Sequence, residues 1–210
     1  MHFFDNKDIF NLDKIYRINL INSCSGFKSA NLLGSISANG IPNVAIFSSV
    51  IHLGSSPPTL GFILRPTTVP RDTYKNIKEF GVFTINHIWE DVIEDAHHTS
   101  AKYPEEISEF DMTNLESEFK GKFNAPFVKN APVQMNMKFI EEIYVPSNNV
   151  MLIVAQIQEL YVQDKLLQED GLINLSEGNI ATINGLDTYA IPKFKKQLSY
   201  QRPKDLNKMS

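Results

Sequence analysis

Short apolar segments, separated by glycine and proline, recur along this 210-residue chain and limit the folds that are open to it. Several of them alternate between apolar and polar residues, which is the pattern of a half-buried β-strand. The segment Ala38-Asn39-Gly40 adds the Asn-Gly pair that closes tight hairpins. The predicted strands are residues 17–22, 30–36, 43–50, 59–64, 82–88, 134–145 and 151–162.

Two segments have helical spacing instead. Residues 72–80 are expected to form a helix capped by Asp72 or Thr73, because a short side-chain oxygen accepts a free N–H group of the first turn. Gly81 suits the left-handed position that ends a helix, and residues 89–98 suit a second helix. Many strands with few short helices and little βαβ alternation predict a mainly β, Greek-key-like barrel, closed or partly closed, rather than a doubly wound sheet.

The length and composition fit one domain with a buried core, since 42% of the residues are apolar and 21% are charged. We expect this domain to span residues 1–210, with an N-terminal extension over 1–16 and a basic tail over 193–210. A net charge of −4 gives no indication of a nucleic acid partner, and no apolar run is long enough for a membrane helix. Cys24 is the single cysteine and no targeting signal is visible, so we expect a cytoplasmic protein.

The densest candidate for a binding site lies between residues 43 and 76. It holds Ser48-Ser49 after one predicted strand, Ser55-Ser56 before the next, and Arg65 after that strand. Hydroxyl groups, backbone amides and a planar guanidinium group can surround a phosphate, and the start of the helix at residue 72 adds partial positive charge. Serine and arginine are also common in solvated turns, which is the alternative interpretation.

The second candidate is the donor-rich segment of residues 96–103, which could face an anion at a helix end. His97 and His98 are adjacent, and adjacent side chains on a helix point about 100° apart, so they do not share a metal ion. We therefore expect no metal site. Neither histidine is paired with a carboxylate in the sequence, and no catalytic residue is assigned.

Several separated stretches resemble, in their order and spacing, the flavin reductase-like family of FMN-binding split barrels, including its flavoredoxin-type members. The resemblance covers nearly the whole chain from Arg17. The matching stretches are Asn43 to Ser49, Ser56-Pro57-Pro58, Gly61-Phe62, Arg65-Pro66, Arg71-Asp72-Thr73-x-x-Asn76-Ile77, Thr84-Ile85-Asn86, residues 96–101, Glu109-Phe110, Ala125-Pro126 and Gly185-Leu186-Asp187-x-Tyr189.

This resemblance implies a split β-barrel that binds FMN (FAD is a second option) at or near the interface of a homodimer. It places Ala45, Phe47 and Ser48 along the isoalloxazine ring or the ribityl chain. It makes Arg65, Thr99, Ser100 and Lys102 candidates for binding the phosphate, and Asn76 a candidate for shaping the pocket. The implied cofactor-binding residues are Asn43, Ala45, Phe47, Ser48, Ser49, Ser56, Arg65, Pro66, Thr73, Asn76, Thr99, Ser100, Ala101 and Lys102.

The activity that the resemblance implies is an NAD(P)H-dependent flavin reductase, in which hydride passes from the nicotinamide C4 to flavin N5. NADH or NADPH would be the donor, and free flavin or a small molecule the acceptor. Two alternatives stay open: an electron-transfer flavoprotein with tightly bound FMN that serves a protein partner, and a non-catalytic flavin-binding protein. We expect neither nucleic acid nor a membrane as a partner.

Overall fold

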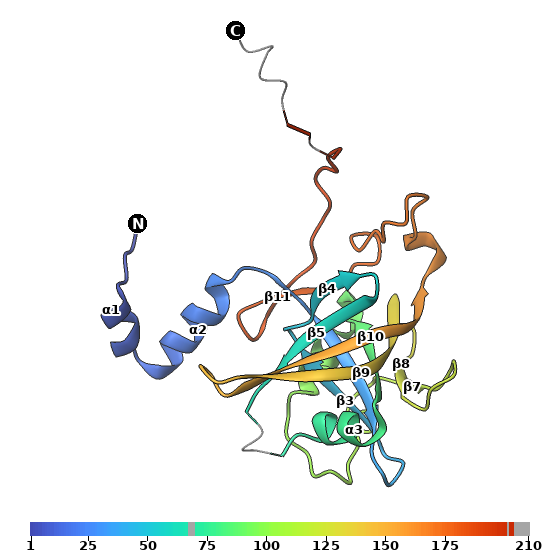
Figure 1. The fold of residues 1–210 in the computed structure, drawn as a ribbon. Coiled ribbons are helices and arrows are strands. Elements are labelled where there is room, and N and C mark those ends of the chain that lie inside the picture. The colour runs from blue at the N-terminus through green and yellow to red at the C-terminus, as the bar shows by residue number, and fades with distance from the viewer. Residues whose placement is uncertain (67–69, 201, 204–210) are drawn as a thin grey trace.

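A seven-stranded antiparallel sheet coils around the core of the protein (Figure 1). The computed structural model describes residues 1–66, 70–200 and 202–203. The strand order is β3-β2-β6-β9-β10-β5-β4, so β3 and β4 are the two edges of a barrel that is only partly closed. The strands are β2 (Asn31–Ile36), β3 (Pro42–Phe47), β4 (Ile51–Ser55), β5 (Pro58–Leu64), β6 (Val82–His87), β9 (Val133–Val145) and β10 (Val150–Val162). The predicted β-barrel is confirmed.

Smaller elements surround this sheet. A second sheet has the order β1-β11-β12, and β7 pairs with β8. These elements are α1 (Asn6–Asn11), α2 (Lys14–Cys24), β1 (Lys28–Ser29), α3 (Asp72–Phe80), η1 (Glu90–Val92), α4 (Ile93–His98), β7 (Ser117–Glu118), β8 (Phe127–Val128), η2 (Asp164–Leu166), β11 (Thr182–Asn184) and β12 (Thr188–Ala190). Within the described residues, no helix is long and apolar enough to cross a bilayer.

The core consists of two hydrophobic clusters on opposite faces of β2 and β3. Inside the barrel, the rings of Phe47, Phe62 and Phe83 meet edge to face, with centroids 5.1 and 5.7 Å apart. Outside, Val44 of β3 and Ala96 of α4 belong to the second cluster. Successive strand residues point to opposite faces, so Phe47 faces the interior whereas Val44 faces α4.

Residues 72–80 form the predicted helix, α3, which is followed by Gly81 at φ 68°. The predicted cap is wrong: Arg71 occupies the N-cap position, and no side chain caps the helix. The hydroxyl of Thr73 instead donates a hydrogen bond of 3.0 Å to Oδ1 of Asn43 on β3. Thr73 is buried, so its hydroxyl needs this tertiary partner.

The strand predicted over residues 17–22 is also wrong, because these residues lie in α2. The Asp13 carboxylate accepts hydrogen bonds from the backbone N–H groups of Ile15 (2.9 Å) and Tyr16 (3.3 Å) and so caps this helix. A six-residue apolar pattern does not by itself separate a strand from a helix. The helix predicted over 89–98 is shorter than expected, since η1 precedes α4.

Candidate functional site

The edge strand β3 presents backbone groups that do not bond to β2. The N–H of Val44 donates to Oε2 of Glu109 (3.1 Å), so it points away from β2. Along an antiparallel strand the direction of these groups alternates, so the N–H of Ile46 points the same way. Ala45 shares the interior face with Phe47 and is half-buried. The edge therefore offers the N–H of Ile46 near the half-buried Ala45, whereas the N–H of Val44 is already bonded to Glu109.

The end of β3 lies beside the end of β5. Ser49 Oγ accepts a hydrogen bond from Ile63 N (3.0 Å) and donates one to Ile63 O (3.1 Å). Phe47, Ser48 and Ser49 are half-buried, and Arg65, just past β5, is exposed. The structure therefore brings this group of predicted residues together with Arg65 and the neighbouring Pro66.

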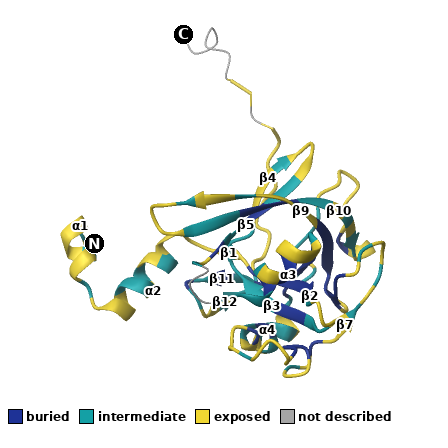
Figure 2. Ribbon diagram, turned by 60° about the horizontal axis from the view of Figure 1, so that its bottom comes forward, coloured by how far each residue is buried: buried dark blue, intermediate teal, exposed yellow. Residues whose placement is uncertain are grey.

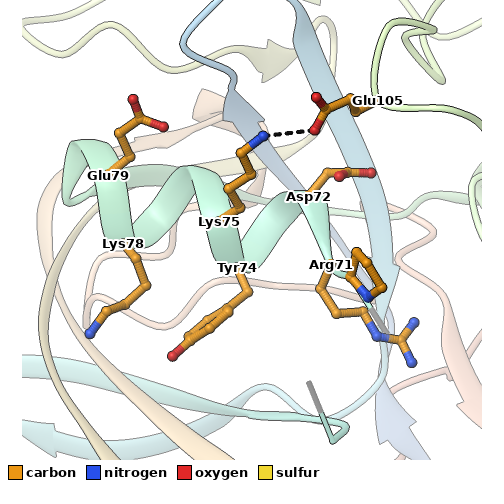
Figure 3. Close-up of a pocket in the computed structure, with 8 residues that line it drawn as sticks. Arg71, Asp72, Tyr74, Lys75, Lys78, Glu79 and Glu105 are labelled. Atoms are coloured by element: carbon orange, nitrogen blue, oxygen red, sulfur yellow. Dashed lines mark hydrogen bonds and ion pairs between the residues drawn. The ribbon is translucent and has the colours of Figure 1, made fainter. Parts of the chain in front are cut away.

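The start of α3 has the features of an anion site. Because no side chain caps α3, the N–H groups of its first turn lack intrahelical partners. Nε of Arg71 is buried and has no hydrogen-bond partner among the described residues. Figure 3 shows the Arg71 side chain extending away from the ion pair that Lys75 and Glu105 form at 2.7 Å. A guanidinium group beside an uncapped helix start suits a phosphate.

An open cavity of about 650 Å³ adjoins this helix start (Figure 3). Its basic residues, Arg71, Lys75 and Lys78, are interspersed with acidic ones. Lys75 is ion-paired with Glu105, and Lys78 is ion-paired with Glu142. Among the described residues, Arg71 is the basic residue of this cavity that has a buried donor without a hydrogen-bond partner. The cavity lining is Pro70, Arg71, Asp72, Tyr74, Lys75, Lys78, Glu79 and Glu105.

Asn43, Thr73 and Asn76 lie in a buried network, where they fix the position of α3. Asn43 Oδ1 accepts from Ser35 Oγ (3.1 Å) and from Thr73 Oγ1 (3.0 Å), and Asn76 Nδ2 donates to Ser35 Oγ (3.1 Å). Asn43 Nδ2 donates to Oε2 of Glu109 at 2.8 Å. Burial raises the pKa of Glu109. These residues position the candidate site indirectly, because their hydrogen bonds hold the start of α3 against β2 and β3.

The remaining predicted residues lie elsewhere in the chain. Ser56 is exposed in the β4–β5 turn, at the opposite end of β5 from Arg65, which is about 20 Å along an extended strand. Thr99 is buried and donates its hydroxyl to Ala96 O (2.7 Å) at the end of α4. The exposed residues Ser100, Ala101 and Lys102 follow. Because α4 packs on the outside of β2 and β3, the residues 99–102 that follow it lie on the opposite side of the sheet from Phe47, which faces the barrel interior.

Sequence reasoning did not single out Arg71 as a candidate ligand-binding residue, nor Glu109 as a residue that positions Asn43. Arg71 stands directly before the predicted helix, and a cation at that place was the available signal. His97 and Tyr189 form a further pair that spacing does not reveal, with 2.9 Å between Nδ1 and the hydroxyl. Burial, together with the charge of Asp187, raises the pKa of Tyr189 to about 12. In the described part of the chain, no three His, Cys, Asp or Glu residues are placed to hold a metal ion.

The fold and the site together define a split-barrel protein with a candidate anion site at the start of α3. Residues 28–179 match the family described as "Flavin reductase like domain". A split-barrel protein from Shewanella frigidimarina NCIMB 400, provisionally assigned as a flavin reductase, is 41% identical with a TM-score of 0.91, over 96% of this chain and 100% of that one. The chain therefore belongs to the flavin reductase-like domain family, as the sequence motifs predict.

More distant solved structures share the fold. Nitrilotriacetate monooxygenase component B from Bacillus cereus is 19% identical with a TM-score of 0.82, over 94% of this chain and 98% of that one. The FMN-binding protein from Thermus thermophilus is 15% identical with a TM-score of 0.71, over 84% of this chain and 93% of that one. Membership of the family, together with the 41% identical Shewanella protein, makes this protein a flavin-related oxidoreductase in its broad class.

Proposed function

We propose that this protein is an FMN-dependent reductase that takes hydride from NADH or NADPH and passes the electrons to free flavin or a small acceptor. The observation that carries the proposal is the buried, unpaired Nε of Arg71 at the uncapped start of α3. The FMN phosphate is a dianion that would satisfy this donor. The start of α3 contacts Asn43 near the beginning of β3, and the half-buried Phe47 and Ser48 lie at the other end of that strand.

In this arrangement Arg71, Arg65 and the first-turn amides of α3 bind the phosphate. Phe47 and Ala45 would contact the isoalloxazine ring, and the edge N–H of Ile46 would be a donor available to it. FMN supplies the redox chemistry, since its N5 accepts a hydride. The protein would align the donor and exclude water, and the edge amide would favour negative charge on the ring. The name of the FMN-binding protein from Thermus thermophilus supports this choice of flavin.

The proposal includes a homodimer with FMN near the subunit interface. Support comes from the placement of residues 99–102, which lie on the opposite face of the sheet from Phe47. On a single chain this donor-rich segment and Phe47 would not share one ligand. In a dimer, Ser100 and Lys102 of one copy would reach the FMN of the other.

The test is an absorbance spectrum of the purified protein with added FMN, followed anaerobically after NADH and then after NADPH. We expect FMN to bind and its bands to bleach with one of the two donors. Bands that persist with both donors would contradict the reductase and favour the electron-transfer or binding alternative. A titration in which FMN does not bind would overturn the flavin site itself.

A further inference from the structure

The N-terminal segment forms an arm that stands clear of the barrel (Figures 1 and 2). Both of its helices are well capped: Asp5 and Asp8 form a reciprocal capping box on α1, and Asp13 caps α2. In the part of the chain that the structure describes, no residue of α1 or α2 is buried. The arm, defined as residues 1–24, thus contributes no residue to either hydrophobic cluster.

Two features indicate that the arm has a partner. Helices of 6 and 11 residues are marginal in water, so most of their stability has to come from packing. Phe10, Ile15 and Ile21 are 78%, 62% and 46% exposed, which concentrates apolar surface on a short segment. The direction of the arm is held by Lys28, whose Nζ donates to Asn22 O (3.0 Å) and to Gly185 O (2.9 Å) of the β11–β12 turn.

A second uncovered apolar surface lies on the barrel. Phe62 of β5 and its cross-strand partner Ile153 of β10 point into the core, so residues 61, 63, 152 and 154 point outward. Leu53 of β4 lies over Gly61 on this outer side. Ile51 and Leu53 are 47% and 43% exposed, and neither belongs to the two hydrophobic clusters. We name this surface, made of residues 51, 53, 61, 63, 152 and 154, the outer face; it lies on β4, β5 and β10, and its exposed apolar area comes from residues other than the buried Gly61 and Val154.

We propose that the arm of one copy packs on the outer face of a second copy, and that the second arm does the same in return. Each chain carries one arm and one outer face. In a two-fold dimer each arm therefore packs on the outer face of the other copy, and neither surface stays uncovered. The inference rests on the homodimer of the proposed function. It adds which segments form the interface.

The Shewanella protein supports a fixed position for the arm. Its alignment at a TM-score of 0.91 leaves out 4% of this chain, which is fewer residues than the arm contains. Much of the arm is therefore matched in a crystal structure at 41% identity. A 24-residue segment that adds no residue to the core of its own barrel would not keep one direction in two proteins without a further surface to pack on.

The first test measures mass and amide hydrogen exchange of the flavin-free protein over a range of concentrations. We expect a monomer–dimer equilibrium in sedimentation, with exchange in α2 and in β4–β5 slowing together by about tenfold or more as the dimer forms. Fast exchange in α2 at concentrations where the protein is dimeric would overturn the arm's role but not the homodimer. Protection of α2 without β4–β5 would overturn the placement on the outer face.

The second test uses the double variant Ile15→Ser/Ile21→Ser, which changes no core residue. We expect its dimer dissociation constant to rise at least about tenfold while its circular dichroism stays that of the wild type. Met112→Ser is the matched control, since Met112 is 45% exposed on a loop outside both surfaces. Equal dissociation constants for the double variant and the wild type would overturn the inference. FMN binding is not part of either measurement, so a failure here is separate from a failure of the flavin site.

Discussion

Asn43 on the edge strand β3 donates a hydrogen bond of 2.8 Å to the carboxylate of Glu109, which lies 66 residues further along the chain. Through its side-chain oxygen, Asn43 also accepts the hydroxyl hydrogen of Thr73 on α3. One amide thus joins an edge strand, a helix start and a distant loop. The candidate phosphate site depends on this junction, because Thr73 lies two residues from Arg71.

Replacing Asn43 with alanine is expected to destabilise the protein. The variant leaves Glu109, Ser35 and Thr73 with unmet polar groups in a buried setting, which costs about 2–3 kcal/mol. Urea unfolding of Asn43→Ala measures this loss. Asn148→Ala in the exposed β9–β10 turn is the control, with little expected change. Equal stability of the two variants would show that the network contributes nothing measurable.

Glu109 predicts a specific pH dependence of stability. Burial raises its pKa above the ordinary value of 4.5, so the folded state binds the proton more tightly than the unfolded state. The free energy of unfolding therefore falls as the pH rises from about 4.5 through the folded pKa. Glu109→Gln keeps an acceptor for Asn43 and Val44 and should remove this part of the slope. Unfolding curves at a series of pH values check this, and an unchanged slope would exclude Glu109 as its source.

Arg71→Ala is expected to weaken FMN binding, because the variant removes the buried donor assigned to the phosphate. Loss of a hydrogen bond to a charged group corresponds to about 10- to 100-fold in the dissociation constant. Lys75→Ala is the control on the same helix, since Lys75 is exposed and paired with Glu105. Flavin fluorescence titrations compare the variants. Similar affinities for Arg71→Ala and Lys75→Ala would remove Arg71 from the site.

Arg65→Ala is expected to weaken FMN binding much more than it alters the fold, because Arg65 is exposed and contributes little to the core. An exposed phosphate contact is solvated, so the effect should be smaller than that of Arg71, about 3- to 10-fold. The same titration measures it, together with the melting temperature. Unchanged affinity would confine phosphate binding to the start of α3.

The sequence predicted the elements whose signals are local. Residues 72–80 have helical spacing and end at Gly81, and both ends of α3 match the prediction. The strand predicted over residues 134–145 is present as β9, and its Met135 and Met137 lie in the core. Local sequence patterns failed where a contact between distant residues determines the structure. Thr73 bonds to Asn43 rather than capping α3, and the partner of Asn43 is a loop residue that no short pattern connects to it.

The candidate site follows the same division. The residues at its strand ends were predictable from the motif. Arg71 became a candidate only because the fold leaves its Nε buried without a hydrogen-bond partner among the described residues. The strand predicted over 17–22 failed for another reason. Its apolar residues have no sheet to join, and Asp13 supplies the cap that favours a helix.

Gly34 on β2 gives a last prediction, about the Ala125-Pro126 stretch that packs on the sheet. A Cβ atom at Gly34 would overlap the carbonyl oxygen of Pro126 and lie 2.6 Å from Thr84 Oγ1. Thr84 Oγ1 donates to that same carbonyl at 2.6 Å, so backbone and side chain are both fixed and neither can move away cheaply. Gly34→Ala should therefore cost about 3 kcal/mol or more.

Gly54→Ala is the matched control for Gly34→Ala. Its Cβ would meet Thr59 Oγ1 at 3.3 Å, and that side chain is part of an exposed turn region that can adjust. Thermal unfolding of both variants should show a large decrease in melting temperature for Gly34→Ala alone. Equal melting temperatures would mean that residues 125–126 can move off β2, and that this close backbone approach is not needed to hold the loop over β6.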